Sequence, residues 1–166
     1  MKSFFGKKRE GKGFTFQSIP SVYFSGGRDG DFVWMEKQPE HADTLFVFND
    51  NERQFYEHQR QIGTTHRCSE GGGNAAIRPY ECSSVPRATG IPTGNNGGYQ
   101  SLSPETKQVI HDAIAHLDSL LATEAYDTVV YSWNQQTQTL GSGIFDVDRA
   151  VLDYIVEQID SAANRH

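Results

Sequence analysis

The stretch Thr44-Leu45-Phe46-Val47-Phe48, followed by Asn49-Asp50-Asn51, decides the fold class of this 166-residue chain. A continuous apolar run without alternation is typical of a strand that is buried on both faces, and such strands lie in sheets that helices cover on each side. The Asn-Asp-Asn triplet ends the strand because its side chains cap and turn the backbone. The stretch therefore predicts the central strand of an α/β sheet.

The C-terminal half supplies the other parts of an α/β layer. Over 103–121, Ser-Pro-Glu provides an N-cap, a first-turn proline and an early acid, and apolar residues recur every three or four positions, which predicts a long amphipathic helix. A strand is expected over 127–132. After a glycine loop, apolar residues over 151–159 predict a closing helix that Asp146 or Asp148 caps. This order of elements favours a right-handed α/β arrangement.

Weaker patterns occupy the first half of the chain. The aromatic side chains of Tyr23, Phe24, Phe46 and Phe48 are expected in the core. The segment 52–70 is polar and loop-like, which predicts a lid over a binding cleft. The expected elements are a strand over 21–25, a short helix over 54–61, a helix start over 74–78 that Pro79 stops, a strand over 88–91 and an open loop over 94–98.

The composition and charge of the chain indicate the number of domains, the compartment and the classes of partner to expect. The chain has 36% hydrophobic and 22% charged residues, with 10 Phe, 7 Tyr and 2 Trp, which indicates one folded domain over 21–166. Basic residues among glycines near the start predict a poorly ordered basic tail over 1–20. A net charge of −6 argues against long nucleic acid as a partner. With no run approaching the ~18 apolar residues of a membrane span and no signal-peptide pattern, we expect a soluble, cytoplasmic protein that does not contact membranes.

The two cysteines, Cys68 and Cys82, are too few for a disulfide framework and lack the paired spacing of a zinc site. The sequence therefore predicts two reduced thiols and no metal site. His66 lies near Cys68 in sequence, but that adjacency does not supply the geometry of a thiolate–imidazole catalytic pair.

Three loops at predicted strand ends indicate a phosphate-binding cleft: Asp50-Asn51, Gly71-Gly72-Gly73 and Gly141-Ser142-Gly143. In open α/β sheets, ligands bind at the carboxyl ends of the strands. Glycine backbone N–H groups can approach a diphosphate closely, and a following helix N-terminus favours its charge. Neither glycine loop is a Walker motif or a dinucleotide fingerprint, so a simple tight connection is the alternative for each loop alone.

Taken in order, these loops and their flanking segments resemble the macrodomain family. The resemblance covers about residues 45–159 and is carried by 48–51 (Phe-Asn-Asp-Asn), 71–78 (Gly-Gly-Gly-Asn-Ala-Ala-Ile-Arg), 88–92 (Ala-Thr-Gly-Ile-Pro) and 129–132 (Val-Val-Tyr-Ser) leading to 141–145 (Gly-Ser-Gly-Ile-Phe). It implies a three-layer α/β/α fold with a mixed central sheet and a cleft for ADP-ribose.

The resemblance also implies the roles of individual residues. Asn51 would contact the distal ribose and orient a water; Asp50, Asp146 and Asp148 are the acids near the proposed loops, and Asp50 and Asp146 are the catalytic candidates among them. The family's adenine-binding acid has no clear match, Asp29 and Asp31 being the candidates, and the glutamate pair of poly(ADP-ribose) glycohydrolases is absent. The implied ligand contacts are Gly71, Gly72, Gly73 and Asn74 at the ribose, Arg78 and Thr93 beside it, Gly141, Ser142, Gly143 and Ile144 at the phosphates, and Phe145 stacking on the ribose or adenine side.

The expected function is binding of ADP-ribose or a related NAD-derived nucleotide, with hydrolysis of an ADP-ribosyl bond as a further activity. The alternatives are a non-catalytic protein that sequesters or senses the nucleotide, and an interaction protein without a small ligand. Arg78 has its own alternative, a structural ion pair with one of the acids. No metal and no cofactor are expected.

Overall fold

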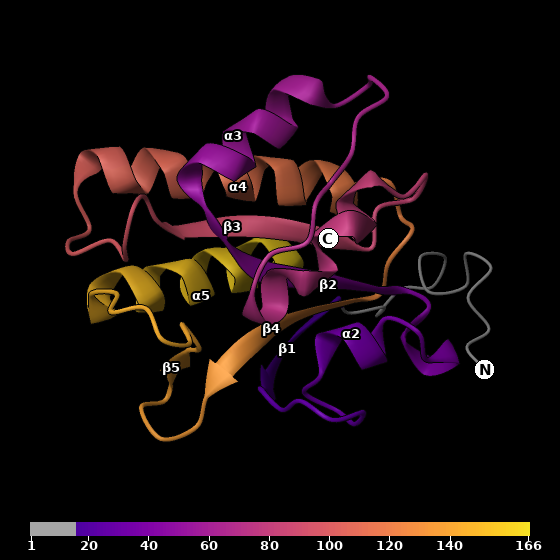
Figure 1. Cartoon of the computed structure of the whole chain (residues 1–166), viewed down its shortest axis with the longest axis horizontal. Helices are drawn as coiled ribbons and strands as arrows, with labels where there is room; N and C mark the ends of the chain where they lie inside the picture. Colours follow the sequence, from indigo (N-terminus) through magenta and orange to yellow (C-terminus); the bar gives the residue numbers. More distant parts are fainter. Residues whose placement is uncertain (1–15) are drawn as a thin grey trace.

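The chain is an α/β protein built on a mostly parallel five-stranded sheet, as seen in a computed structural model that describes residues 16–166 (Figure 1). The elements in chain order are β1 (Gln17–Val22), α2 (Phe32–Met35), the 3₁₀ helix η1 (Pro39–His41), β2 (Thr44–Asn51), α3 (Glu52–Gln61), the 3₁₀ helix η2 (Gly73–Cys82), β3 (Ala88–Gly94), α4 (Pro104–Leu121), β4 (Thr128–Asn134), β5 (Thr139–Leu140) and α5 (Arg149–Asn164).

The strand order is β1-β4-β2-β3, and these four strands are parallel. β2 lies in the interior, and residues 44–48 are all buried, which confirms the central strand. β2 pairs with β4 only as far as Phe46↔Val130, while β5 pairs antiparallel with the end of β4 at Trp133↔Leu140. β1 pairs with the opposite edge of β4 as far as Trp133, so β5 pairs with the edge of β4 that faces β2. β2 and β4 therefore separate at their carboxyl ends, and β5 lies between them.

Helices cover both faces of the sheet because alternate residues of β2 point in opposite directions. Leu45 and Val47 belong to the larger core, which α4 and α5 cover. Phe46 and Phe48 belong to the smaller core with residues of α2 and η2. The same arrangement is visible in Figure 1, where α4 and α5 lie together and α2 lies apart from them.

The strongest local signals in the sequence are confirmed. Ser103 caps α4 through its Oγ, which accepts a hydrogen bond from Thr106 N at 3.1 Å. Asp148 occupies the N-cap position of α5, although its side chain makes no capping hydrogen bond. Among residues 16–166, none of the helices has the length and apolarity that crossing a bilayer requires.

Several element boundaries differ from the predictions. β1 begins at Gln17, within the segment expected as a tail, because it pairs with β4 at the sheet edge, where Pro20 is tolerated. Phe16, also within the predicted tail, is buried in the larger core, and residues 1–15 lie outside the described residues. Helix α3 confirms the short helix expected over 54–61 and begins two residues earlier, at Glu52, because Asn51 caps it. η2 continues through Pro79, whose fixed φ suits 3₁₀ geometry.

Two further differences concern burial and strand length. Tyr23 and Phe24 were expected in the core, but they are 50% and 39% exposed because β1 ends before them. β3 extends to Gly94 rather than stopping at Ile91, and every residue in it is buried. Continued pairing with the end of β2, as in Asp50↔Pro92, accounts for the extra length.

Candidate functional site

The end of β2 holds both glycine loops in place. Asn49 donates a hydrogen bond from Nδ2 to the carbonyl of Gly141 at 2.5 Å, and Ser132 Oγ donates to the same carbonyl at 2.9 Å. The neighbouring residue, Asp50, accepts a hydrogen bond from Arg78 Nη2 at 2.6 Å. Two loops that lie about seventy residues apart in sequence are therefore tied to adjacent positions of one strand.

Arg78 connects Asp50 to the triple-glycine loop. Its Nη1 donates to the carbonyl of Ser69 at 3.2 Å, and a Cβ on Gly71 would come within 2.8 Å of the same nitrogen. On the other side, a Cβ on Gly90 would come within 2.5 Å of Asp50 Oδ2. The absence of side chains at these two glycines gives the ion pair its space.

The Asp50–Arg78 pair is buried, with side-chain exposures of 0% and 7%. Burial raises the pKa of Asp50, and the charge and hydrogen bond of Arg78 act against that rise. The structural ion pair considered for Arg78 from the sequence is the observed arrangement, so its guanidinium points inward to Asp50 rather than outward to solvent.

The outer surfaces of the glycine loops are open. A Cβ on Gly72, Gly73 or Gly143 would meet nothing within 4 Å, and Gly73 and Gly143 have φ of 57° and 65°. Within residues 16–166, the N–H groups of Gly143 and Ile144 have no hydrogen-bond partner.

Large apolar side chains surround the same edge of the sheet. Ile144 and Phe145 are 95% and 57% exposed in the loop after β5. Tyr23 and Phe24 are exposed in the loop after β1, a strand whose carboxyl end lies beside that of β4. Exposed apolar residues close to open backbone N–H groups are features of a ligand-binding edge.

The remaining sequence-predicted residues differ in accessibility. Asn51 caps α3, since its Oδ1 accepts from Gln54 N at 2.8 Å and its Nδ2 donates to Gln54 Oε1. Thr93 is buried in β3. Asn74 lies in η2, and Asp146 is exposed before α5. Asp50 is thus connected to the triple-glycine loop through Arg78, the Asn51 side chain is directed to α3, and the Thr93 side chain is enclosed.

The two acids considered for adenine contact are both near α2. Asp31 caps that helix, and its carboxylate accepts hydrogen bonds from the N–H groups of Gly26, Gly27 and Trp34. Burial acts to raise its pKa, but these backbone donors outweigh burial and hold the pKa below its usual value. Asp29 lies 3.8 Å from His41 Nε2.

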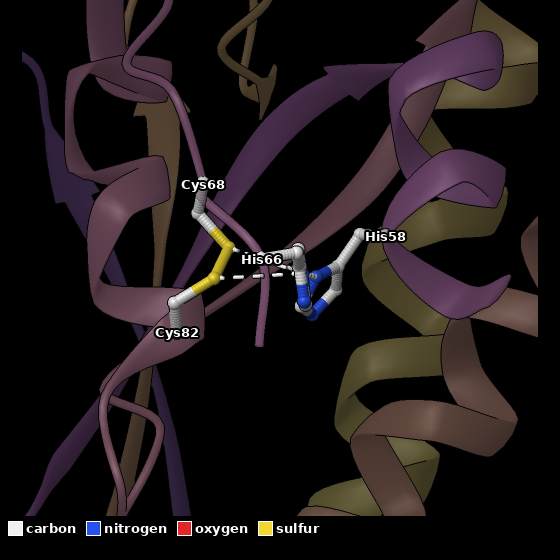
Figure 2. A group of neighbouring side chains, drawn as sticks. All are labelled: His58, His66, Cys68 and Cys82. Carbon is white, nitrogen blue, oxygen red and sulfur yellow. Dashed lines mark hydrogen bonds between the residues drawn. A yellow bond between two sulfur atoms is a disulfide. The ribbon is translucent and has the colours of Figure 1, made fainter. Parts of the chain in front are cut away.

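A second polar cluster, which no sequence pattern predicted, lies beside η2 (Figure 2). Cys68 and Cys82 form a disulfide, so the prediction of two reduced thiols is wrong for this structure. The Nδ1 atom of His58 lies 3.0 Å from His66 Nε2, and both imidazoles contact the Cys68 sulfur at 3.7 Å. We call His58, His66, Cys68 and Cys82 the His–Cys cluster.

Buried ionisable groups surround the His–Cys cluster. Burial and the neighbouring imidazoles of His116 and His66 lower the pKa of His58 to about 4, so its ring is neutral near pH 7. Burial and the negative charge of Asp50 raise the pKa of Glu81 to about 8, against the opposing effect of Arg78. His58 Nε2 lies 3.9 Å from Glu81 Oε2.

Two hollows border the His–Cys cluster, with volumes of about 660 and 490 Å³. Cys68 and Glu70 line the first, and His58, Glu81 and His116 line the second. The separations of eight, two and fourteen residues between successive cluster members match no standard pattern, so only the path of the chain through α3 and η2 reveals the cluster.

The fold and the two polar sites define an α/β protein with a loop-lined edge at the carboxyl ends of parallel strands. No protein-family model matches the chain, and neither the curated proteins nor the solved structures contain a significant match.

Proposed function

We propose that the carboxyl-end edge of the sheet binds an ADP-ribose-like nucleotide, in the manner of the macrodomains that the sequence resembles. One observation carries the proposal: adjacent residues of β2, Asn49 and Asp50, hold the two glycine loops through Gly141 and Arg78. A cleft for a dinucleotide-sized ligand needs two phosphate- or sugar-binding loops in a fixed relation, and shared attachment to one buried strand supplies it.

Each loop has a separate task in this proposal. The N–H groups of Gly143 and Ile144 bind the diphosphate, for which backbone donors without other partners are suited. The open backbone at Gly72 and Gly73 lies against the distal ribose, because a Cβ-free surface permits close approach. Phe145 packs on the ribose or the adenine side.

A second candidate function is non-catalytic sequestration or sensing of the same nucleotide. It is favoured by the state of the three residues considered for catalysis. Asp50 forms a buried ion pair with Arg78, Asn51 caps α3, and Asp146 is exposed to solvent. A general base must lie within hydrogen-bond reach of its water, but the Asp50 side chain has no solvent exposure and the Asn51 side chain caps α3.

The test is a calorimetric titration of the purified chain with ADP-ribose, with AMP and NAD as comparators. In the variant Gly143→Glu, a carboxylate lies where the diphosphate binds, so we expect binding of ADP-ribose to be lost. Gly63→Glu is the matched control, because Gly63 also has positive φ, 90°, and open space around its Cβ position, but it lies in the loop after α3.

The outcomes separate the candidates. Binding of ADP-ribose that survives in Gly63→Glu and disappears in Gly143→Glu supports the cleft. The protein is then incubated with an ADP-ribosylated substrate, and chromatography of the mixture shows whether ADP-ribose is released, which distinguishes a hydrolase from a binder. No heat with any of the three nucleotides refutes the proposal.

A further inference from the structure

We propose that the His–Cys cluster is a Zn²⁺ site in the dithiol state of this protein, with His58 Nδ1, His66 Nε2 and the sulfurs of Cys68 and Cys82 as its four ligands. These four atoms lie within 4.8 Å of one another and come from three parts of the chain, namely α3, the segment before the triple glycine, and the end of η2. Two imidazoles and two thiolates are a set that zinc prefers in structural sites.

The distances between the ligand atoms fit a tetrahedron. Zn–N and Zn–S bonds of ordinary length place two nitrogens about 3.3 Å apart and a nitrogen and a sulfur about 3.6 Å apart. The nitrogens of His58 and His66 are separated by 3.0 Å. The nitrogen–sulfur distances are 3.7 Å from His58 to Cys68, 3.7 Å from His66 to Cys68 and 3.5 Å from His66 to Cys82.

The second nitrogen of each imidazole faces an acceptor, as in most zinc sites with histidine ligands. His66 Nδ1 lies 3.2 Å from the carbonyl of Thr64. His58 Nε2 faces the Glu81 carboxylate, whose two oxygens are buried without a hydrogen-bond partner in the described chain. Because His66 Nδ1 donates to the Thr64 carbonyl, the proton of the 3.0 Å hydrogen bond between the two rings is on His58 Nδ1 in the disulfide form. Zn²⁺ binding requires His58 to carry its proton on Nε2 instead, where the Glu81 carboxylate lies 3.9 Å away to accept it. Glu81 is therefore a positioning residue for His58.

The disulfide observed here is the oxidised counterpart of the proposed site. A dithiol reductant supplies two electrons and two protons to the Cys68–Cys82 bond, which leaves two thiols and the disulfide of the reductant. Zn²⁺ then binds as both thiol protons pass to solvent. The sulfurs must separate to about 3.8 Å in a tetrahedral site. Cα atoms 5.9 Å apart and the exposed position of Cys82 leave room for that rotation.

Either linkage closes the same stretch of chain. Residues 69–81, between the two cysteines, contain the triple glycine and Arg78, so zinc or a disulfide constrains the loop that lies against Asp50. The zinc proposal stands on the His–Cys cluster alone and does not require nucleotide binding.

The experiment measures zinc binding by the full chain in two redox states. The protein is reduced, stripped with a chelator and titrated with Zn²⁺ against a chromophoric competitor, and Co²⁺ replaces Zn²⁺ for visible spectroscopy. We expect one Zn²⁺ per reduced chain with a sub-micromolar dissociation constant and a tetrahedral Co²⁺ spectrum with sulfur charge-transfer bands, and no binding by the disulfide form.

Variants assign the ligands. Cys82→Ser and His66→Ala change partly accessible positions and should weaken Zn²⁺ binding more than 100-fold, whereas His111→Ala, an exposed histidine outside the cluster, should not change it. Glu81→Gln should weaken Zn²⁺ binding about 10- to 100-fold while the Co²⁺ spectrum stays tetrahedral. A Glu81 that served only the stability of the fold would not change the zinc affinity of a folded chain. Circular dichroism confirms that each variant is folded.

Three results would overturn the proposal. They are a folded, reduced wild-type chain that binds no Zn²⁺, equal affinity in the disulfide and dithiol states, and a His66→Ala or Cys82→Ser chain that binds as tightly as His111→Ala.

Discussion

Replacing Glu36 by glutamine should abolish a loss of stability that the wild-type chain suffers as the pH rises from 5 to 8. The Glu36 side chain has 0% exposure, both of its carboxylate oxygens lack a hydrogen bond within the described chain, and Arg87 Nη2 lies 3.4 Å away. Burial raises the pKa of Glu36 from 4.5 to about 8, and the charge of Arg87 opposes the rise only in part. The folded chain therefore keeps a proton that the unfolded chain releases.

The sign and size of the effect follow from that difference in pKa. Because the folded state binds more protons, the contribution to stability is complete below pH 4.5 and is lost as the pH rises through about 8. One proton corresponds to about 1.4 kcal/mol per pH unit, so the wild type should lose about 3 to 4 kcal/mol relative to Glu36→Gln between pH 5 and 8. Glutamine is neutral throughout and nearly isosteric.

The assay is urea unfolding of both chains at half-unit steps from pH 5 to 9, followed by far-ultraviolet circular dichroism. Glu40→Gln is the control, because Glu40 is exposed in the neighbouring η1 and its variant should follow the wild type. If the Glu36→Gln and wild-type curves run parallel across this range, Glu36 is ionised and paired in the folded chain, and the reasoning from its burial is wrong.

Three other predictions concern single interactions. Arg78→Met should lower the free energy of unfolding by about 3 to 5 kcal/mol, because Asp50 stays buried without its counter-charge. Adding Asp50→Asn should recover part of this loss. A cost below about 1 kcal/mol in urea unfolding would contradict the buried pair. Ser103→Ala should cost about 1 kcal/mol through loss of the α4 cap, and an unchanged thermal melt would show that the cap contributes nothing. Reducing the Cys68–Cys82 bond in the presence of a chelator should cost about 3 kcal/mol, since the bond closes a loop with a sequence separation of 14, and equal stability of both redox forms would contradict that constraint.

Local patterns predicted the elements whose stability is local. The apolar run from Thr44 to Phe48 identified the buried strand because a strand covered on both faces has no polar positions. Ser103 and Pro104 located the start of α4 because capping and proline geometry act within one helical turn.

Elements that depend on distant partners were missed or misplaced. β1 contains Pro20 and little β-propensity, and it forms because it pairs with β4 more than a hundred residues later. The two-residue β5 exists only against the end of β4. The exposure of Tyr23 and Phe24 depends on where β1 ends, which an aromatic pattern cannot reveal.

Of the two polar sites, the sequence indicated one and not the other. The glycine loops and Asp50-Asn51 were recognisable, because glycine and strand-end residues suggest a ligand edge from local chemistry alone. That Asp50 bonds to Arg78 rather than facing a ligand is a matter of side-chain direction inside the fold. The His–Cys cluster could not be predicted from the sequence, since its four members are spread over 58–82 and meet only after α3 and η2 have packed.

By itself, the sequence determined the α/β class, the buried strand and the long capped helix, because burial pattern and capping act over neighbouring residues. Only the tertiary structure decided that both glycine loops are held by the end of β2 and that two histidines and two cysteines converge beside η2. Such arrangements depend on contacts between side chains distant in sequence, and the packing of the whole chain sets them.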